Sequence, residues 1–363
     1  MNVLRDAKRA LRSLLVLLVA LVVVLSVAGC KRRHHKSDKD DPGKVVYQRV
    51  CAVCHGKKGE GYAADRAPKL VGSGLLAAAS DDFLRRVIDD GRKGTTMTAW
   101  SRMKGGPLTR PEVDALIGYL RKRDKAPRVV LDEKPLSGDR ARGAEIYARE
   151  CVRCHGKEGV EGPQVHIGDG DFLESATNGF LREAIAHGRN ETPMPSFEPT
   201  LGEQGIEDLV TFLRSLQPPA VARARMAQAV PSVLPLGPVP LNPDGPEPEG
   251  FGFYPASPTK VEVVKAQLDR GARMAILDAR GPPGYVDEHI AGAVSVPYYD
   301  PAPFLEHLPK DAWLVCYCAC PSAESGMLAG KLAAAGFKKI TVLEEGLNLW
   351  RAKQFPIHKG LAP

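Results

Sequence analysis

The sequence lacks a strong net charge and an apolar run long enough to cross a membrane. Its 363 residues carry a formal charge of +7, and the first 29 residues hold four basic side chains and one acidic one, so the remainder carries +4. A weak excess of this size argues against a nucleic-acid partner. The composition, 44% hydrophobic and 26% charged, is that of a soluble protein, and the length predicts two or three domains.

An unbroken apolar run at residues 14–25 follows a basic stretch. It is shorter than the roughly 20 residues of a transmembrane helix, so it predicts the hydrophobic part of an export signal; an uncleaved anchor is the alternative. The next segment, Ser26-Val27-Ala28-Gly29-Cys30, resembles a bacterial lipoprotein lipobox. The resemblance implies a signal peptide at residues 1–29, a periplasmic location and a lipid on Cys30 that anchors the chain to a membrane. Polar residues 30–42 predict a flexible tether.

Four of the eight cysteines lie in two copies of the pattern C-x-x-C-H. Two thiols one helical turn apart can reach the two vinyl groups of a porphyrin, and the adjacent histidine can bind its iron. The spacing is therefore typical of c-type heme attachment and predicts two covalently bound heme c groups. A redox-active cysteine pair or half of a zinc site is the alternative. The two copies are Cys51-Ala-Val-Cys54-His55 and Cys151-Val-Arg-Cys154-His155.

The sequence around the two motifs is also repeated. "YQRVCAVCHGKKGEG" at 47–61 matches "YARECVRCHGKEGVEG" at 147–162. Further along, "FLRRVIDDGRKGTTMTAW" at 83–100 aligns without a gap to "FLREAIAHGRNETPMPSF" at 180–197. A duplicated domain explains both matches.

Methionines at matching positions of the two copies predict the sixth ligand of each iron. A thioether sulfur can bind opposite the histidine and raises the reduction potential. Met97 and Met194 lie 42 and 39 residues after the two motif histidines. Met103 competes with Met97, and His187 and His166 compete with Met194, but the repeat alignment selects the methionine pair. Ordinary core packing of these methionines is the alternative.

Apolar residues at helical spacing predict the helices of each copy. Helices at 44–54 and 140–154 lead into the motifs, and helices at 111–123 and 205–216 end the copies.

Aromatic residues take matching positions on the two last helices, Tyr119 on one and Phe212 on the other. Each ring can pack against the helix that leads into its motif. The chain here resembles the small class I cytochrome c domains, over residues 43–126 and 137–217. The resemblance implies an all-α fold around a covalent heme with histidine and methionine axial ligands. It also implies a redox partner protein in an electron-transport chain.

A proline-rich stretch follows, with eleven prolines from Pro218 to Pro258. It predicts an extended linker at residues 218–257. In residues 258–363 segments typical of strands alternate with segments typical of helices, which predicts an α/β domain with a parallel sheet. Catalytic groups in such domains collect where strands end and loops enter helices.

Three segments of this last domain resemble the rhodanese family. The first two are Leu277-Asp278-Ala279-Arg280 and the run "EHIAGAVSVP" at 288–297. The third is a cysteine-led loop that enters a helix ending "AAAGFKKITVLEEGLNLW". The resemblance implies sulfur transfer, in which a loop cysteine becomes a persulfide and passes on its outer sulfur. Cys318 is nearest the family's nucleophile, whereas Asp278 and Arg280 are expected to fix the end of the strand.

The loop itself, "ACPSAESG" at 319–326, departs from the family pattern. It has no arginine to hold an anionic donor such as thiosulfate and offers Glu324 instead. Sulfide, polysulfide or a partner's persulfide remains as the reduced-sulfur donor, with an inactive binding domain as the alternative. A metal site, or a disulfide from Cys318 to Cys316 or Cys320, is a further alternative for these cysteines.

The sequence therefore predicts a multidomain protein with two all-α cytochrome c domains followed by an α/β rhodanese-like domain. The expected function is one-electron transfer by an exported diheme cytochrome, with Cys318 accepting reduced sulfur and the released electrons leaving through the hemes. A pure electron carrier with a docking domain is one alternative. Enzymatic hemes, as in a peroxidase, are another.

Overall fold

The structure is a computed structural model. The expected signal peptide, Cys30, most of the tether, Cys320 and much of the proline-rich linker lie outside the described residues. No helix among the described residues is long and apolar enough to cross a membrane. The described residues are 41–62, 67–190, 192–217, 230–231, 234, 238–319 and 321–363.

The first copy is a set of helices, as predicted. Three of them follow one another without a break and lead into the first motif, and the middle one is a π-helix. The N-terminus of the last helix is capped by a hydrogen bond, which the Thr109 N–H donates to the Glu112 carboxylate at 2.9 Å. The helices are α2 (Pro42–Val46), η2 (Tyr47–Cys51), α3 (Ala52–His55), α4 (Leu75–Ala78), α5 (Asp81–Asp90), η3 (Arg102–Lys104) and α6 (Arg110–Arg123).

The second copy repeats this order. Its last helix begins at Glu198, earlier than the predicted start at residue 205. A short helical turn precedes the main helix, and the two are joined at Gly202, which has φ 60°. The helices are α7 (Arg140–Glu150), α8 (Val152–His155), η4 (Lys157–Gly159), α9 (Gly170–Ser175), α10 (Asn178–His187) and α11 (Glu198–Ser215).

In each copy the helix that leads into the motif crosses the last helix at a glycine. A Cβ on Gly43 would lie 2.0 Å from the backbone oxygen of Ala115. A Cβ on Gly143 would lie 2.0 Å from the backbone oxygen of Asp208. Only glycine permits so close an approach of two helix backbones.

Next to each crossing, two aromatic rings are in contact. The ring centroids of Tyr47 and Tyr119 are 5.5 Å apart, and those of Tyr147 and Phe212 are 5.2 Å apart. The contact expected for the two last-helix aromatics is therefore confirmed.

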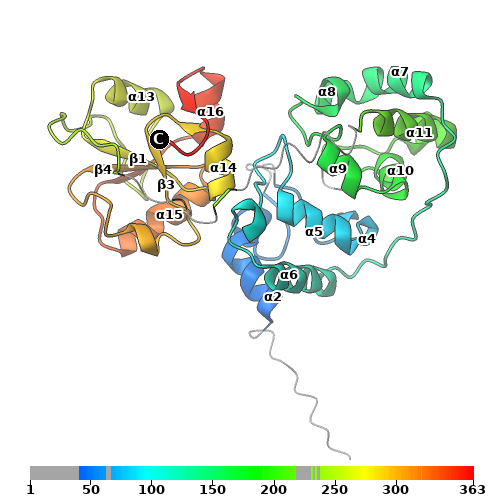
Figure 1. Cartoon of the computed structure of the whole chain (residues 1–363), viewed down its shortest axis with the longest axis horizontal. Helices are drawn as coiled ribbons and strands as arrows, with labels where there is room; N and C mark the ends of the chain where they lie inside the picture. The colour runs from blue at the N-terminus through cyan, green and yellow to red at the C-terminus, as the bar shows by residue number, and fades with distance from the viewer. Residues whose placement is uncertain are drawn as a thin grey trace, which may run out of the picture. The chain divides into compact units, whose positions relative to one another are not determined.

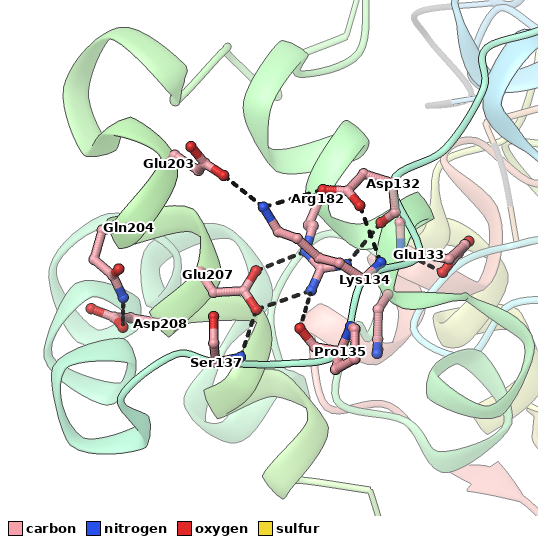
Figure 2. A network of polar contacts seen from close by, with 12 residues as sticks. Asp132, Glu133, Lys134, Pro135, Ser137, Arg182, Glu203, Gln204, Glu207 and Asp208 are labelled. Carbon is pink, nitrogen blue, oxygen red and sulfur yellow. Dashed lines mark hydrogen bonds and ion pairs between the residues drawn. The ribbon is translucent and has the colours of Figure 1, made fainter.

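A buried ion pair joins the last two helices of the second copy. The Arg182 guanidinium on α10 donates to both oxygens of Glu207 on α11, at 2.7 and 3.0 Å. The same guanidinium donates to the backbone oxygen of Asp132 at 2.8 Å, and Glu207 accepts the Ser137 N–H at 2.9 Å. Figure 2 shows Arg182 between Glu207 and this preceding segment. The pair therefore fixes the chain that enters the second copy.

The last domain has a four-stranded parallel sheet in the order β3-β1-β4-β5, and Figure 1 labels three of these strands among their helices. Every residue of β1 and of β4 is buried, as expected for a sheet covered on both faces. The predicted parallel α/β domain is thus confirmed. Its elements are α13 (Val261–Asp269), β1 (Met274–Asp278), α14 (Pro282–Asp287), β2 (His289–Ile290), β3 (Ala293–Ser295), η5 (Ala302–Phe304), β4 (Trp313–Tyr317), α15 (Ala323–Ala334), β5 (Ile340–Val342), α16 (Gly346–Ala352) and β6 (Ile357–His358).

One strand prediction needs correction. The segment expected to form a turn and one strand, residues 289–300, contains two short strands that belong to different sheets. β3 joins the parallel sheet, whereas β2 pairs antiparallel with β6 near the end of the chain. Two-residue strands such as β2 and β6 have no readable alternation of apolar residues, so the sequence pattern does not reveal them.

Candidate functional site

The first cysteine of each motif lies in an environment that disfavours a charged sulfur. Burial raises the pKa of the Cys51 thiol and of the Cys151 thiol to about 12. A redox-active pair or a zinc site needs thiolates. Moreover, no group of three or more His, Cys, Asp or Glu side chains within the described part of the chain could hold a metal ion.

Both motif histidines are oriented by a backbone carbonyl. The Nδ1 atom of His55 lies 3.0 Å from the oxygen of Pro68, and that of His155 lies 2.9 Å from the oxygen of Val165. A carbonyl can only accept, so Nδ1 carries the hydrogen and Nε2 keeps the lone pair that a metal requires. The sequence did not reveal these partners, because a backbone oxygen leaves no residue signature.

A tyrosine one helix upstream supports each motif. The Tyr47 hydroxyl donates to the oxygen of Gly56 at 2.7 Å, and the Tyr147 hydroxyl donates to the oxygen of Gly156 at 2.8 Å. These glycines directly follow the histidines and have φ 81° and 77°, values that favour glycine. The chain turns sharply there in both copies, and the tyrosine holds that turn.

The first predicted methionine ligand lies in a closed loop. The Arg92 N–H donates to the oxygen of Met97 at 2.8 Å. The Thr95 hydroxyl donates to the oxygen of Arg92 at 2.7 Å and accepts the Met97 N–H at 3.1 Å. A Cβ on Gly91 would lie 2.6 Å from the Met97 oxygen, so the loop also requires this glycine.

The second methionine lies in the same loop, bond for bond. The Arg189 N–H donates to the oxygen of Met194 at 3.1 Å. The Thr192 hydroxyl donates to the oxygen of Arg189 at 2.8 Å and accepts the Met194 N–H at 3.2 Å. Gly188 replaces Gly91, and a Cβ there would lie 2.6 Å from the Met194 oxygen. The signal for this loop is the pattern G-R-x-x-T-x-M, which both copies share.

The competing ligands lie in less suitable places. Met103 is 86% exposed, whereas Met97 and Met194 pack against the helical core. The His187 side chain is exposed and lies 3.4 Å from the Glu183 carboxylate. Two thiols, an oriented imidazole and a thioether are thus the donor set that each copy offers, and they fit a heme c.

The last domain places Cys318 directly after β4. Its side chain is fully buried, and its Sγ atom lies 3.4 Å from the Ser325 hydroxyl oxygen in the first turn of α15. The Leu347 N–H donates to the Cys318 oxygen at 2.8 Å. Cys316 is a buried thiol in β4, two residues before Cys318. The predicted strand-to-helix junction is confirmed, whereas the pairing of Cys318 with Cys320 falls outside the described residues.

Arg280 is the only arginine in the three segments that resemble the rhodanese family, and a carboxylate holds its guanidinium. Its guanidinium donates to both oxygens of Asp278, at 2.9 and 2.6 Å, and to the Glu288 oxygen at 2.6 Å. Asp278 also accepts the Tyr317 hydroxyl at 2.7 Å. The expectation that this pair fixes the end of β1 is confirmed. In the loop itself Glu324 is buried in the first turn of α15.

In comparison with known proteins, two protein families match these regions of the chain. The family described as "Cytochrome C oxidase, cbb3-type, subunit III" matches residues 38–120 and 138–213, and the rhodanese-like domain family matches residues 260–353. These ranges agree with the helical copies and with the α/β domain.

Several curated relatives are subunits of cbb3-type cytochrome c oxidases. FixP of Bradyrhizobium sp. (strain ORS 278) is 29% identical over 182 residues, which is 48% of this chain and 60% of FixP. CcoP of Azospirillum sp. (strain B510) is 27% identical over 195 residues, or 48% of this chain and 61% of CcoP. The chain thus spans about 60% of the length of these relatives.

A solved rhodanese-like domain from Anabaena sp. is 29% identical and covers 29% of this chain and 80% of its own, with a TM-score of 0.27. The matched cytochrome c domains imply covalently bound heme c. The chain is a helical cytochrome c region followed by a C-terminal rhodanese-like α/β domain.

Proposed function

We propose that the chain is an exported diheme cytochrome c that transfers single electrons. Heme iron supplies one-electron oxidation and reduction. The observation that carries this proposal is the duplicated hydrogen-bond pattern: both motif histidines present Nε2, and both methionines lie in loops closed by the same bonds.

Each residue of the two sites has a specific role in the proposal. The four motif thiols attach two hemes covalently, one in each copy. His55 and Met97 bind one iron, and His155 and Met194 bind the other. With both axial positions filled by protein, neither iron has an open place for a substrate, which favours electron relay over catalysis at iron.

The location and partner of the chain are also proposals. The lipobox resemblance supports a lipid on Cys30 and a place on the periplasmic side of the cell envelope. The named relatives are oxidase subunits, which supports a redox partner protein within an electron-transport chain.

The first experiment counts the hemes. Protein matured in a bacterial periplasm is unfolded, extracted with acidic acetone and assayed as its pyridine hemochrome. We expect two hemes per chain that stay with the polypeptide. Colourless or one-heme polypeptide would overturn the diheme proposal.

A peroxidase-like role for the hemes is tested with the same material. An iron with an open position takes up carbon monoxide or cyanide rapidly. We expect slow or absent uptake by the native protein, and rapid uptake at either heme would support the enzymatic alternative.

The second part of the proposed function concerns sulfur. Cys318 lies at a strand-to-helix junction beside Ser325, the position at which α/β enzymes carry reactive groups. When the Cys318 thiol and hydrosulfide form a sulfur–sulfur bond, the product is a persulfide, and one proton and two electrons are released. We propose that two oxidised hemes would take up these electrons, one each.

The donor class follows from the charges around this loop. The described loop residues carry no cation, Glu324 is buried there, and the nearby Arg280 is held by Asp278. A doubly charged anion such as thiosulfate is therefore disfavoured. Sulfide, polysulfide or a partner's persulfide is the proposed donor.

The test adds sulfide, polysulfide or thiosulfate anaerobically to oxidised protein and to Cys318→Ser, and follows heme reduction by absorbance. We expect reduction by sulfide that is lost in the variant. Polysulfide would pass its outer sulfur to Cys318 without releasing electrons. Reduction that persists in Cys318→Ser would leave a pure electron carrier with a docking domain. Cys316→Ser serves as the matched control, because that thiol is buried within β4.

A further inference from the structure

Two arginines in the helical region have buried nitrogen atoms with no hydrogen-bond partner. They are the Nε atom of Arg92 and the Nη2 atom of Arg189. A buried guanidinium nitrogen without an acceptor is costly, and native structures contain few of them. Such a group indicates an anionic partner that the polypeptide itself does not provide.

The two arginines occupy the same place in the two copies. Each follows the glycine that ends its helix, and each is fixed through its backbone to the methionine loop. The N–H of Arg92 donates to Met97, and the N–H of Arg189 donates to Met194.

The role of the arginine side chains follows from comparing the two loops. Of seven residues, the copies share glycine, arginine, threonine and methionine, while the other three differ. The glycine is required by the close approach of the chain, and the threonine closes the loop. The methionine is the proposed ligand. The arginine closes the loop through its backbone, and its side chain makes one long contact with it, from Arg189 Nη1 to the Gly188 oxygen at 3.5 Å, in the second copy. The loop therefore does not explain why the side chain is the same in both copies.

Aromatic packing holds both side chains in place. The Arg189 guanidinium carbon lies 4.9 Å above the Phe180 ring, and that of Arg92 lies 5.4 Å above the Phe172 ring, which belongs to the second copy. These contacts hold the planar groups but use none of their N–H donors. The unpaired nitrogen of each guanidinium can therefore serve a second partner in its own plane.

We propose that Arg92 and Arg189 bind propionate carboxylates of the hemes and thereby set the reduction potentials. This inference rests on the proposed diheme function. A guanidinium and a carboxylate form two parallel charge-assisted hydrogen bonds, which suits the unpaired N–H groups. A fixed positive charge near the iron also favours the reduced state, because reduction removes one positive charge from the site.

The test uses the full chain with both hemes attached. Arg92→Gln and Arg189→Gln are compared with wild type by potentiometric titration resolved into two one-electron components. We expect each substitution to lower the potential of at least one component, and the double variant to lower the potentials further. The propionate bending bands in the resonance Raman spectrum should shift in the same variants.

Two kinds of control separate the arginine role from general charge and folding effects. Arg102→Gln and Arg140→Gln remove exposed arginines from the same two copies and should leave both readouts unchanged. Arg92→Lys and Arg189→Lys keep the charge but not the paired donors. They should keep the potentials near wild type and still shift the Raman bands, and they provide the readout if a glutamine variant does not mature.

The outcomes distinguish this inference from the proposed function. If wild-type protein carries no covalent heme, the proposed function itself fails. If both hemes are attached and the potentials and Raman bands of the glutamine and lysine variants match those of the surface controls, the arginine assignment alone is overturned.

Discussion

At the scale of residues, the assignment of the methionine ligands makes a direct prediction. Met97→Leu should lower the reduction potential of one heme and allow that heme to bind carbon monoxide rapidly, because a leucine cannot bind iron. Potentiometric titration and carbon monoxide difference spectra measure the two effects. Met103→Leu is the control, since that side chain is 86% exposed and should change neither property. The opposite pattern in the two variants would assign Met103 instead.

A second residue-scale prediction concerns the helix crossing of the first copy. Gly43→Ala should reduce the free energy of unfolding by about 1–3 kcal/mol, because its Cβ would meet the backbone of α6. Gly118→Ala on α6 is the matched control: a Cβ there meets nothing within 4 Å. That variant should be neutral or more stable by up to about 1 kcal/mol. Denaturant unfolding of the heme-bound chain measures both, and equal effects would contradict the crossing.

Sequence alone named the candidate ligand and nucleophile residues but not what surrounds them. The internal repeat favours Met97 over Met103. In the structure Met103 is exposed, whereas Met97 packs against the core. The carbonyl partners of the histidines, at Pro68 and Val165, could not be predicted. The sequence repeat shows that both methionine loops contain an arginine. Only the structure shows that each arginine has a buried nitrogen atom without a hydrogen-bond partner.

At the scale of elements, the acid stability of the second copy depends on the contact between α7 and α11. A hydrogen bond from Arg142 to the Asp208 carboxylate holds the pKa of that carboxyl down to about 2. The folded-state pKa is below the ordinary value of about 4, so this stability is complete above that pH and is lost as the pH falls towards 2.

The corresponding prediction is that thermal unfolding of the second copy shifts to lower temperature between about pH 4 and pH 2. Asp208→Asn should lower the melting temperature at neutral pH and flatten this acid dependence. Glu145→Gln, an exposed carboxylate on the same helix as Arg142, should keep the wild-type profile. Circular dichroism over a pH series tests the prediction, and an unchanged profile in Asp208→Asn would exclude this contact as the cause.

Long elements were predictable and short ones were not. The helices that begin and end each copy carry apolar residues at helical spacing, and the structure has helices at all four positions. The central parallel strands were visible as buried apolar runs. By contrast, β2 and β6 are two residues each and exist because two distant segments pair. Such pairing is a tertiary effect that no local pattern contains.

At the scale of the whole molecule, the duplicated copies predict that each heme can be removed separately. The double substitution Cys151→Ala and Cys154→Ala should reduce the heme content from two to one. Each copy has about 80 residues, a size at which a core without its porphyrin is marginal. The second copy should therefore become sensitive to protease while the first keeps its heme.

Heme quantification and mass spectrometry of protease-resistant fragments test this outcome. Cys316→Ser is a control for the loss of a thiol elsewhere in the chain and should keep both hemes. Loss of both hemes from the double variant would show that the two copies mature as one cooperative unit.

The methionine loops have one further consequence. Each is closed by main-chain and threonine hydrogen bonds that need no iron, so the position of the thioether is set by the polypeptide. As the proposed iron ligand, a methionine held in this way would move little when the iron changes oxidation state. The reorganisation energy of electron exchange is then small, and the rate at each copy becomes governed chiefly by driving force and by the separation from its redox partner.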